Sequence, residues 1–364
     1  MKQELLILTC LSFLACKKIK TENQPFNDYQ ARTNLSLAFE EFPIQGTTIR
    51  AIQVLNDSTV WFAGSGGNFG YTQDNGKSWH RDVEEYQGKK LEFRSLKVQP
   101  NGDVFLVGVA DPAVVLKSSD NGISWNVVYE DLTPNAFFDA IEFWDEKHGM
   151  LLGDPVNGCF HIALTNDGGD TWNKVDCSVL PPALANEAPF AASNTNIAVM
   201  NNRGWFATGG KSESRVYYTT DKGLTWNVSS TPIVSGKQMT GIYSIDFIDE
   251  MNGVVVGGNW DKVNENWQNI AVTSDGGMSW NVVADSANLG YHSCVKFIPG
   301  TRGKELLATH ARASNGPNGI SYSNDRGITW QSLENRGLIT VRFANRNLAW
   351  LAGKNKIARL TITP

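Results

Sequence analysis

The chain has 364 residues, with 32 Lys and Arg against 37 Asp and Glu, so its formal net charge is −5. This acidic balance excludes nucleic-acid binding driven by bulk positive charge. Hydrophobic residues make up 41% and charged residues 19% of a chain that also holds 34 Gly and 12 Trp, which is typical of a folded, turn-rich protein.

The first predicted element is a targeting segment. An apolar run from Leu5 to Ala15 has the length of a signal-peptide core and is too short to span a bilayer as a helix. The run ends in Phe-Leu-Ala-Cys at residues 13–16, which resembles the lipobox of bacterial lipoproteins. The resemblance implies that residues 1–15 are removed and that Cys16 is lipidated, the alternative being an ordinary signal peptide cut elsewhere. We therefore expect an exported lipoprotein, anchored on the periplasmic or surface side of the bacterial envelope.

Residues 16–34 are predicted to be the lipidated Cys and a polar, flexible tether. The chain beyond them repeats one eight-residue motif, Ser/Thr-x-Asp-x-Gly-x-Ser/Thr-Trp, in six copies. The copies are Thr72 to Trp79, Ser118 to Trp125, Thr165 to Trp172, Thr219 to Trp226, Thr273 to Trp280 and Ser323 to Trp330. A period of about 50 residues is typical of repeats in which each copy is one supersecondary unit.

Each repeat reads as short apolar strands, with the motif between the third and fourth. The motif Asp can accept hydrogen bonds from the turn backbone, the Gly can take a positive φ, and the Trp can pack between neighbouring units. The structural aspartates are Asp74, Asp120, Asp167, Asp221, Asp275 and Asp325. The alternative, that they are calcium ligands or catalytic acids, is disfavoured because one carboxylate per turn is too few ligands for calcium.

These motifs resemble the Asp-box (BNR) repeats of sialidase-like propellers, and the resemblance covers residues 35–364. After six units, three strands remain, at Leu338 to Phe343, Leu348 to Gly353 and Lys356 to Thr363. We predict that Leu35 to Ile44 supplies their fourth strand. The expected fold is thus one all-β domain, a seven-bladed β-propeller closed by pairing of its N- and C-terminal strands.

Two cysteines flank the hairpin that carries the third motif. If Thr165 faces Thr171 across the turn, then Cys159 and Cys177 lie directly opposite each other. A disulfide is then possible in an oxidising compartment, and two small buried thiols are the alternative.

Candidate site residues come from the mouth of the predicted ring, where the inner strands start, on the face opposite the motif turns. Alignment of the repeats places there Arg50, Arg94, Asp139, Tyr243 and His292 from strand starts, with Asp154, Glu187 and Arg215 from adjoining loops. Three arginines on one concave face favour recognition of a carboxylate, a phosphate or an acidic partner segment. For each residue taken singly, a solvated loop position is the competing interpretation.

Three stretches, Ile49 to Val54, Phe138 to Phe143 and Lys356 to Leu360, resemble the exported bacterial proteins related to the photosystem II stability and assembly factor. The resemblance implies a membrane-associated binding or assembly scaffold with no cofactor. We expect a monomer that binds a protein partner or a carbohydrate ligand at its mouth and the membrane through its lipid anchor, with no nucleic acid as a partner. No metal site is expected, because the histidines are scattered.

The alternative function is a sialidase-like glycoside hydrolase. In that class an arginine triad, here Arg50, Arg94 and Arg215, would hold the substrate carboxylate. Tyr243 would be the nucleophile, Glu187 its helper and Asp139 the acid/base. The family's first arginine lies in Tyr/Phe-Arg-Ile-Pro, whereas the strings around both Arg50 and Arg94 lack the Pro.

Overall fold

The structure is a computed structural model that describes residues 29–283, 289–310 and 319–364. Cys16 and the predicted signal peptide lie outside the described residues. The chain divides into a unit Met1–Gln30 and a unit Ala31–Pro364, and the second unit holds all the strands given below. Among the described residues, no helix has the length and apolar character needed to cross a membrane.

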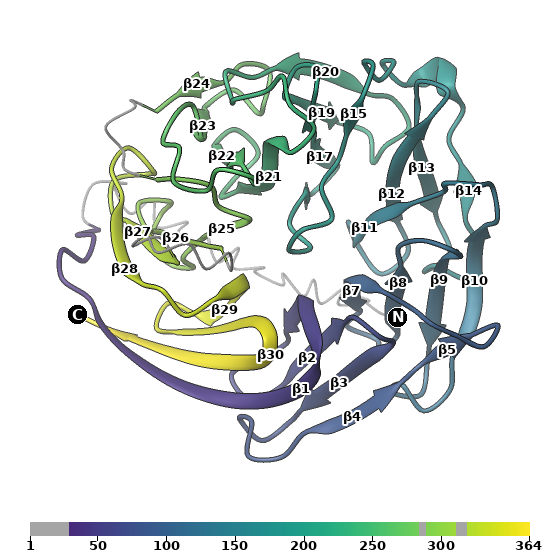
Figure 1. Ribbon diagram of the computed structural model, residues 1–364, viewed down its shortest axis with the longest axis horizontal. Helices are drawn as coiled ribbons and strands as arrows, with labels where there is room; N and C mark the ends of the chain where they lie inside the picture. The colour runs from purple at the N-terminus through teal and green to yellow at the C-terminus, as the bar shows by residue number, and fades with distance from the viewer. Residues whose placement is uncertain (1–28, 284–288, 311–318) are drawn as a thin grey trace, which may run out of the picture. The chain divides into compact units, whose positions relative to one another are not determined.

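Six antiparallel sheets of four or six strands follow one another around an axis in the unit Ala31–Pro364 (Figure 1). The first sheet has the order β29 (Leu338–Asn345), β30 (Leu348–Thr363), β1 (Ser36–Val54), β2 (Val60–Gly64), β3 (Asn68–Thr72) and β4 (His80–Val83). The next two consist of β7 (Phe93–Val98), β8 (Val104–Gly108), β9 (Ala113–Ser118) and β10 (Asn126–Asp131), then β11 (Phe138–Phe143), β12 (Gly149–Val156), β13 (Cys159–Thr165) and β14 (Asn173–Lys174).

The remaining three large sheets complete the ring. One consists of β16 (Ile197–Met200), β17 (Arg203–Ala207), β19 (Arg215–Thr219) and β20 (Asn227–Ser230). The next has the order β15 (Glu187–Ala188), β18 (Gly209–Gly210), β21 (Thr240–Phe247), β22 (Gly253–Asn259), β23 (Ile270–Thr273) and β24 (Asn281–Val282). The last consists of β25 (Cys294–Phe297), β26 (Leu306–Thr309), β27 (Ile320–Ser323) and β28 (Gln331–Glu334). A small ribbon joins β5 (Glu85–Tyr86) to β6 (Lys89–Lys90). The fold is therefore an all-β propeller.

The two ends of this unit pair with each other in the first sheet, as predicted. Residues 36–43 of β1 pair with residues 356–363 of β30, and the register then shifts between Pro43 and Thr48 before β1 pairs with β2. The start of β30 pairs with β29. Seven separate sheets are not observed, because β1 and β30 are each continuous and join the first and last strand groups into one six-stranded sheet.

The six motifs form one kind of hydrogen-bonded turn between the third and fourth strands. In the first, Ser78 donates from its backbone N–H to Asp74 Oδ1 at 2.9 Å and from its hydroxyl to Oδ2 at 2.6 Å. The Gly76 N–H donates to Thr72 Oγ1 at 2.9 Å. The same carboxylate contacts recur at Asp120, Asp167, Asp221, Asp275 and Asp325. Each motif Asp thus makes its hydrogen bonds within its own turn.

Aromatic packing joins neighbouring sheets. The motif residue Trp125 packs edge-on against Phe69 of the preceding sheet, with ring centres 5.1 Å apart. Further round the ring, Trp205 on β17 stacks on Phe247 of β21 at 3.8 Å, and Trp205 is completely buried. Such contacts make each sheet depend on the next for burial of its apolar face.

Strand register separates two faces of the ring. In the first sheet, Ile49 at the start of the inner segment of β1 faces Gly64, at the end of β2 where the hairpin to β3 begins. The motif turn instead follows Thr72, which pairs with Val60 at the other end of the same strands. Arg50 and Val54 are four positions apart, or about 13 Å along a strand. The motif turns and Arg50 therefore lie at opposite ends of the sheet.

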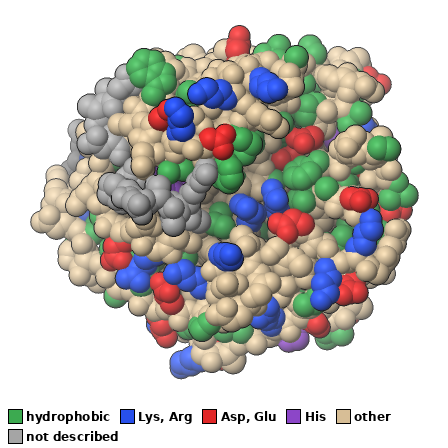
Figure 2. Space-filling view, viewed as in Figure 1, with side chains coloured by type: hydrophobic (Ala, Val, Ile, Leu, Met, Phe, Trp, Pro, Cys, Tyr) green, Lys and Arg blue, Asp and Glu red, His purple; other side chains and the backbone are tan. Residues whose placement is uncertain are grey.

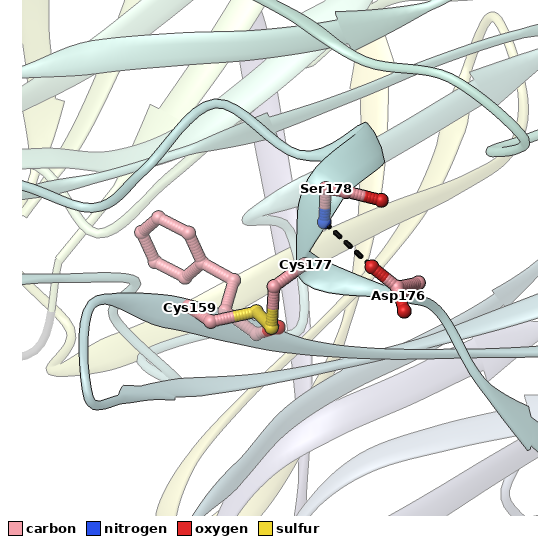
Figure 3. Close-up of a disulfide and its surroundings, with 5 residues drawn as sticks. Cys159, Asp176, Cys177 and Ser178 are labelled. Atoms are coloured by element: carbon pink, nitrogen blue, oxygen red, sulfur yellow. Dashed lines mark hydrogen bonds between the residues drawn. A yellow bond between two sulfur atoms is a disulfide. The ribbon is translucent and has the colours of Figure 1, made fainter.

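A disulfide joins Cys159 to Cys177, with their Cα atoms 5.8 Å apart. The proposed facing of Thr165 and Thr171 is wrong by one residue, because Leu164 pairs with Asn173. The ladder ends at Lys174, and Cys177 instead reaches Cys159 from the 3₁₀ helix η1 (Cys177–Val179), where Asp176 caps the Ser178 N–H (Figure 3).

Candidate functional site

In four of the sheets, the inner strand carries a β-bulge close to the end that lies at the mouth. The register shifts across Arg50 in β1, Arg94 in β7, Asp139 in β11 and Tyr243 in β21. A bulge adds one unpaired residue and can re-aim its side chain, and bulges are frequent beside binding sites. Four of the predicted site residues thus occupy equivalent bulge positions, which explains why aligning the repeats selected them.

A cavity of about 740 Å³ opens at this mouth, and five of the predicted residues line it. They are Arg50, Arg94, Asp154, Glu187 and Tyr243. Basic, acidic and apolar side chains meet near the middle of the face seen in Figure 2. The cavity wall also contains residues 183–192, which precede β16, and Trp260 from the loop after β22.

The wall continues into a segment that the sequence analysis did not predict, residues 191–196, here called the axial segment. It bonds to inner strands from several sides of the ring. The carbonyls of Ala192, Asn194 and Thr195 accept hydrogen bonds from Arg50, from Arg342 and from the Ile245 N–H, respectively. The Ser193 hydroxyl donates to the Ser293 carbonyl, and Asn194 Oδ1 accepts from the Ser95 hydroxyl. The chain itself therefore connects inner strands from several sides of the ring at this level.

Two guanidinium groups share the cavity without complete pairing. Arg50 Nη1 donates to the Ala192 carbonyl at 3.1 Å, while its buried Nε has no hydrogen-bond partner among the described residues. Burial and the nearby charge of Arg94 lower the pKa of Arg50. Arg94 donates to Glu92 at 3.3 Å and lies over the ring of Phe137 at 5.9 Å. This arrangement leaves donor capacity for an anionic group.

A pair of carboxyl groups lies beside the arginines. Asp139 is completely buried, and neither of its oxygens has a hydrogen-bond partner among the described residues. Burial and the neighbouring Asp154 raise the pKa of Asp139 well above its usual value, and Arg94 opposes this shift only in part. Burial also raises the pKa of Asp154 to about 6.

The third predicted arginine is used differently. Arg215 does not line the cavity; it donates from Nε and Nη2 to the buried carboxylate of Glu187 at 3.0 and 2.5 Å. Glu187 also accepts from the Thr208 hydroxyl at 2.6 Å and from the Leu184 N–H at 2.8 Å. This ion pair holds the wall segment in place, so Arg215 does not join Arg50 and Arg94.

Two further predicted residues are internal. The Tyr243 hydroxyl donates to the Met239 carbonyl at 3.1 Å, its ring stacks on Phe190 at 4.2 Å, and burial raises the pKa of the phenol. His292 is completely buried, with its ring nitrogens 3.1 Å from the Gly290 carbonyl and from Ser321 Oγ. Burial holds the pKa of His292 well below its usual value. In the described part of the chain, no group of three or more His, Cys, Asp or Glu could hold a metal ion.

The fold and this cavity define the class: a β-propeller with a pocket of charged and apolar side chains at one mouth. No family model and no curated protein matches the chain. Solved structures match its fold at low identity. The structure described as YCF48 bound to D1 peptide is 15% identical, with a TM-score of 0.64 over 94% of this chain and 100% of that chain.

Two further structures show the same fold. YCF48 from Cyanidioschyzon merolae is 14% identical, with a TM-score of 0.59 over 89% of this chain and 98% of that one. A catalytically inactive virginiamycin B lyase from Staphylococcus aureus with quinupristin is 15% identical, with a TM-score of 0.61 over 90% and 100% of the two chains. The chain is thus a β-propeller that matches both the photosystem II assembly factor and the lyase in structure.

Proposed function

We propose that this propeller binds a carboxylate-bearing segment of a protein partner in the mouth cavity. The observation that carries the proposal is the pairing of Arg50 and Arg94 in one concave site, with a buried Nε of Arg50 left unsatisfied by the described residues. The guanidinium groups of Arg50 and Arg94 have donor capacity left for a ligand carboxylate. Binding, with no chemical turnover, is the proposed activity.

The cavity rim supports a polypeptide as the ligand. Trp260, 39% exposed, and Leu184, 37% exposed, lie on the cavity wall near the two arginines. Trp and Arg are enriched where protein interfaces gain most of their binding energy. The matched YCF48 structure holds a D1 peptide, which gives support for a protein partner and does not identify the partner of this chain. A carbohydrate ligand is the second possibility at the same cavity.

The glycoside hydrolase alternative has less support. Its mechanism would need a Tyr nucleophile next to a carboxylate helper. Glu187 is instead bonded to Arg215, Thr208 and Tyr217, and the Tyr243 hydroxyl is bonded to a backbone carbonyl. Arg215 would also have to leave its ion pair to complete an arginine triad.

Two finer features belong to the same proposal. We count the six-stranded sheet of β29, β30, β1, β2, β3 and β4 as two blades, which gives seven; the register shift between Pro43 and Thr48 supports a boundary there. We also propose export and lipid anchoring through Cys16. The support is the apolar run before Cys16 and the Cys159–Cys177 disulfide, since disulfides persist in oxidising compartments.

The test is peptide binding by the folded chain. A fluorescein-labelled octapeptide library rich in Glu and Asp would be screened by fluorescence anisotropy, and the best binder kept as the probe. We expect Arg50→Glu with Arg94→Glu to weaken the probe at least about 100-fold, since each reversal removes a charge-assisted contact and adds repulsion. Circular dichroism would show that the variant is folded before its binding is compared.

The matched control is Lys77→Glu with Lys147→Glu. It makes the same change in net charge at exposed residues on the motif-turn face. Unchanged binding in the Arg50 and Arg94 variant, or equal loss in the control, would contradict the site. Turnover of fluorogenic sialosides that is abolished by Tyr243→Phe would favour the hydrolase instead.

A further inference from the structure

Beneath the two arginines lies a pair of carboxyl groups that the proposed binding of a carboxylate does not by itself explain. Asp139 is the bulge residue of β11, and Asp154 lies on the neighbouring strand β12. Phe138 pairs with Gly153, and the Asp154 N–H donates to the Phe137 carbonyl at 2.9 Å. The strand register therefore brings both carboxyl groups to the mouth end of one sheet.

Asp139 is the more unusual member of the pair. Its side chain is completely buried, and both oxygens lack a hydrogen-bond partner among the described residues. An ionised carboxylate in such a place is strongly disfavoured, whereas a protonated one is tolerated. Asp154 lines the cavity, so it connects this buried group to whatever occupies the pocket.

Arg50 and Lys211 line the same cavity, and the strands packed on β11 supply one further cation at the mouth end. Strand β7 contributes Arg94, and the strands β8 and β16, which also pack on β11, carry no titratable residue. On β13, His161 lies opposite Gly153, is bonded to Tyr129 and Asp131, and has a pKa lowered to about 4 by burial. Further along β7 and β11, Lys97 and Glu142 pair with each other. The charge of the carboxyl pair is therefore balanced mainly by Arg94.

We propose that the pocket takes up an anionic group together with a proton, which one carboxyl group of the pair Asp139 and Asp154 accepts. This inference rests on the proposed function and specifies how its site is regulated. When the pair is ionised, it neutralises Arg94 and repels a ligand carboxylate. When the pair holds a proton, only one negative charge remains on it, so a ligand carboxylate beside Arg94 and Arg50 is repelled less.

The direction of the pH effect follows from this arrangement. Burial places the pKa of Asp154 at about 6, and an anionic ligand raises the pKa of the pair further by repulsion. A proton is then taken up on binding, so affinity falls as the pH rises above about 6. The cavity would thus release its ligand in alkaline surroundings and retain it in mildly acidic ones.

The first test measures the pH dependence of binding. The acidic octapeptide probe would be titrated against the folded chain between pH 5.5 and 8.5 by fluorescence anisotropy. The Kd should rise by up to about tenfold per pH unit above the pKa of the free pair, the limit for uptake of one proton. Asp154→Asn should remove this slope and bind at pH 7.5 about as tightly as the unchanged chain at pH 5.5.

The control is Asp261→Asn, which removes an exposed carboxylate from the loop after β22, next to the cavity residue Trp260. It should retain the slope of the unchanged chain. A probe that binds with the same Kd at every pH would overturn this inference and leave the proposed function standing. A probe library with no binder at any pH would overturn both.

A second measurement needs no ligand. Infrared spectra at pH 7 should show the carbonyl stretch of a protonated carboxyl group, and Asp139→Asn should remove it. The two variants change one carboxyl each to an amide of the same shape, so folding can be checked by circular dichroism in both. Absence of the protonated carboxyl signal in the unchanged chain would overturn the proton-holding pair whatever the peptide does.

Discussion

At the scale of single residues, Arg50 and Arg215 show how burial decides whether a charged side chain can serve as a site. Both are largely enclosed. Arg215 meets the buried Glu187 carboxylate in a two-point ion pair, whereas Arg50 has one carbonyl contact and an unsatisfied Nε among the described residues. The first arrangement stabilises a loop, and the second leaves binding capacity in a cavity.

Asp139 gives a prediction about stability and pH. Its pKa is raised in the folded state, so the stability that it contributes is fully present below the unfolded value near 3.9 and is lost as pH rises through the folded value. Asp139→Asn should therefore be more stable than the unchanged chain at pH 8, by at least ~1 kcal/mol, or about 2–4 °C. The two chains should melt alike near pH 4. Differential scanning calorimetry at both pH values measures this, and equal melting at pH 8 would contradict it.

The sequence placed three residues correctly at the mouth of the ring, but it did not predict the bonding partners of the others. Arg50, Arg94 and Tyr243 were found because the repeat places equivalent residues at strand starts. The ion pair of Arg215 with Glu187 was not, because Glu187 lies 28 residues before Arg215, in the segment that precedes β16. Partners of this kind are set by tertiary packing, which a local pattern does not encode.

At the scale of elements, a short segment before β1 closes the ring on the motif-turn face. The Arg32 guanidinium donates to Glu305 at 2.8 Å from Nε and at 2.5 Å from Nη2. The backbone carbonyl of Arg32 accepts hydrogen bonds from the Tyr322 hydroxyl and from the Asn324 side-chain amide, both at 3.0 Å. Arg32 therefore ties the start of the unit to the last motif-bearing sheet.

Removal of one partner of this buried pair should be costly. The side chains of Arg32 and Glu305 are 4% and 0% exposed, so Glu305→Gln leaves a buried guanidinium without its counter-charge. We expect a loss of about 3 kcal/mol in the free energy of unfolding. The control, Glu40→Gln, breaks the ion pair of Glu40 with Arg359, whose side chains are 56% and 30% exposed. It should cost less than about 1 kcal/mol in the free energy of unfolding. Urea unfolding compares the two, and similar losses would contradict the assignment.

Elements with local signals were predictable, and elements held by distant contacts were not. The six motif turns were expected from their residues because each Asp bonds within four residues of itself. The axial segment carries no such signal: Asn194 bonds to Ser95 and Arg342, which lie 99 and 148 residues away. Only the folded ring brings those strands around it.

At the scale of the whole unit, closure depends on one pairing between chain start and chain end. Residues 36–43 pair with residues 356–363 in eight successive positions. Leu360 and Ile362 on this strand are completely buried, and Leu37 and Phe39 pack in the same cluster. Because the sheets form a ring, this pairing also removes the exposed edge at which two open ends could associate.

Three truncations test that dependence. A chain that starts at residue 29 retains every strand of the ring and should melt at the same temperature as the full chain. A chain that starts at residue 45 leaves the edge of β30 unpaired and exposes Leu360 and Ile362, so it should aggregate or lose cooperative unfolding. A third chain that starts at residue 34 separates the causes, because it lacks Arg32 and retains the eight paired residues. The chain that starts at residue 34 should lose about as much stability as Glu305→Gln and remain monomeric in size-exclusion chromatography. Cooperative melting of the chain that starts at residue 45 would show that the ring does not need its terminal strand.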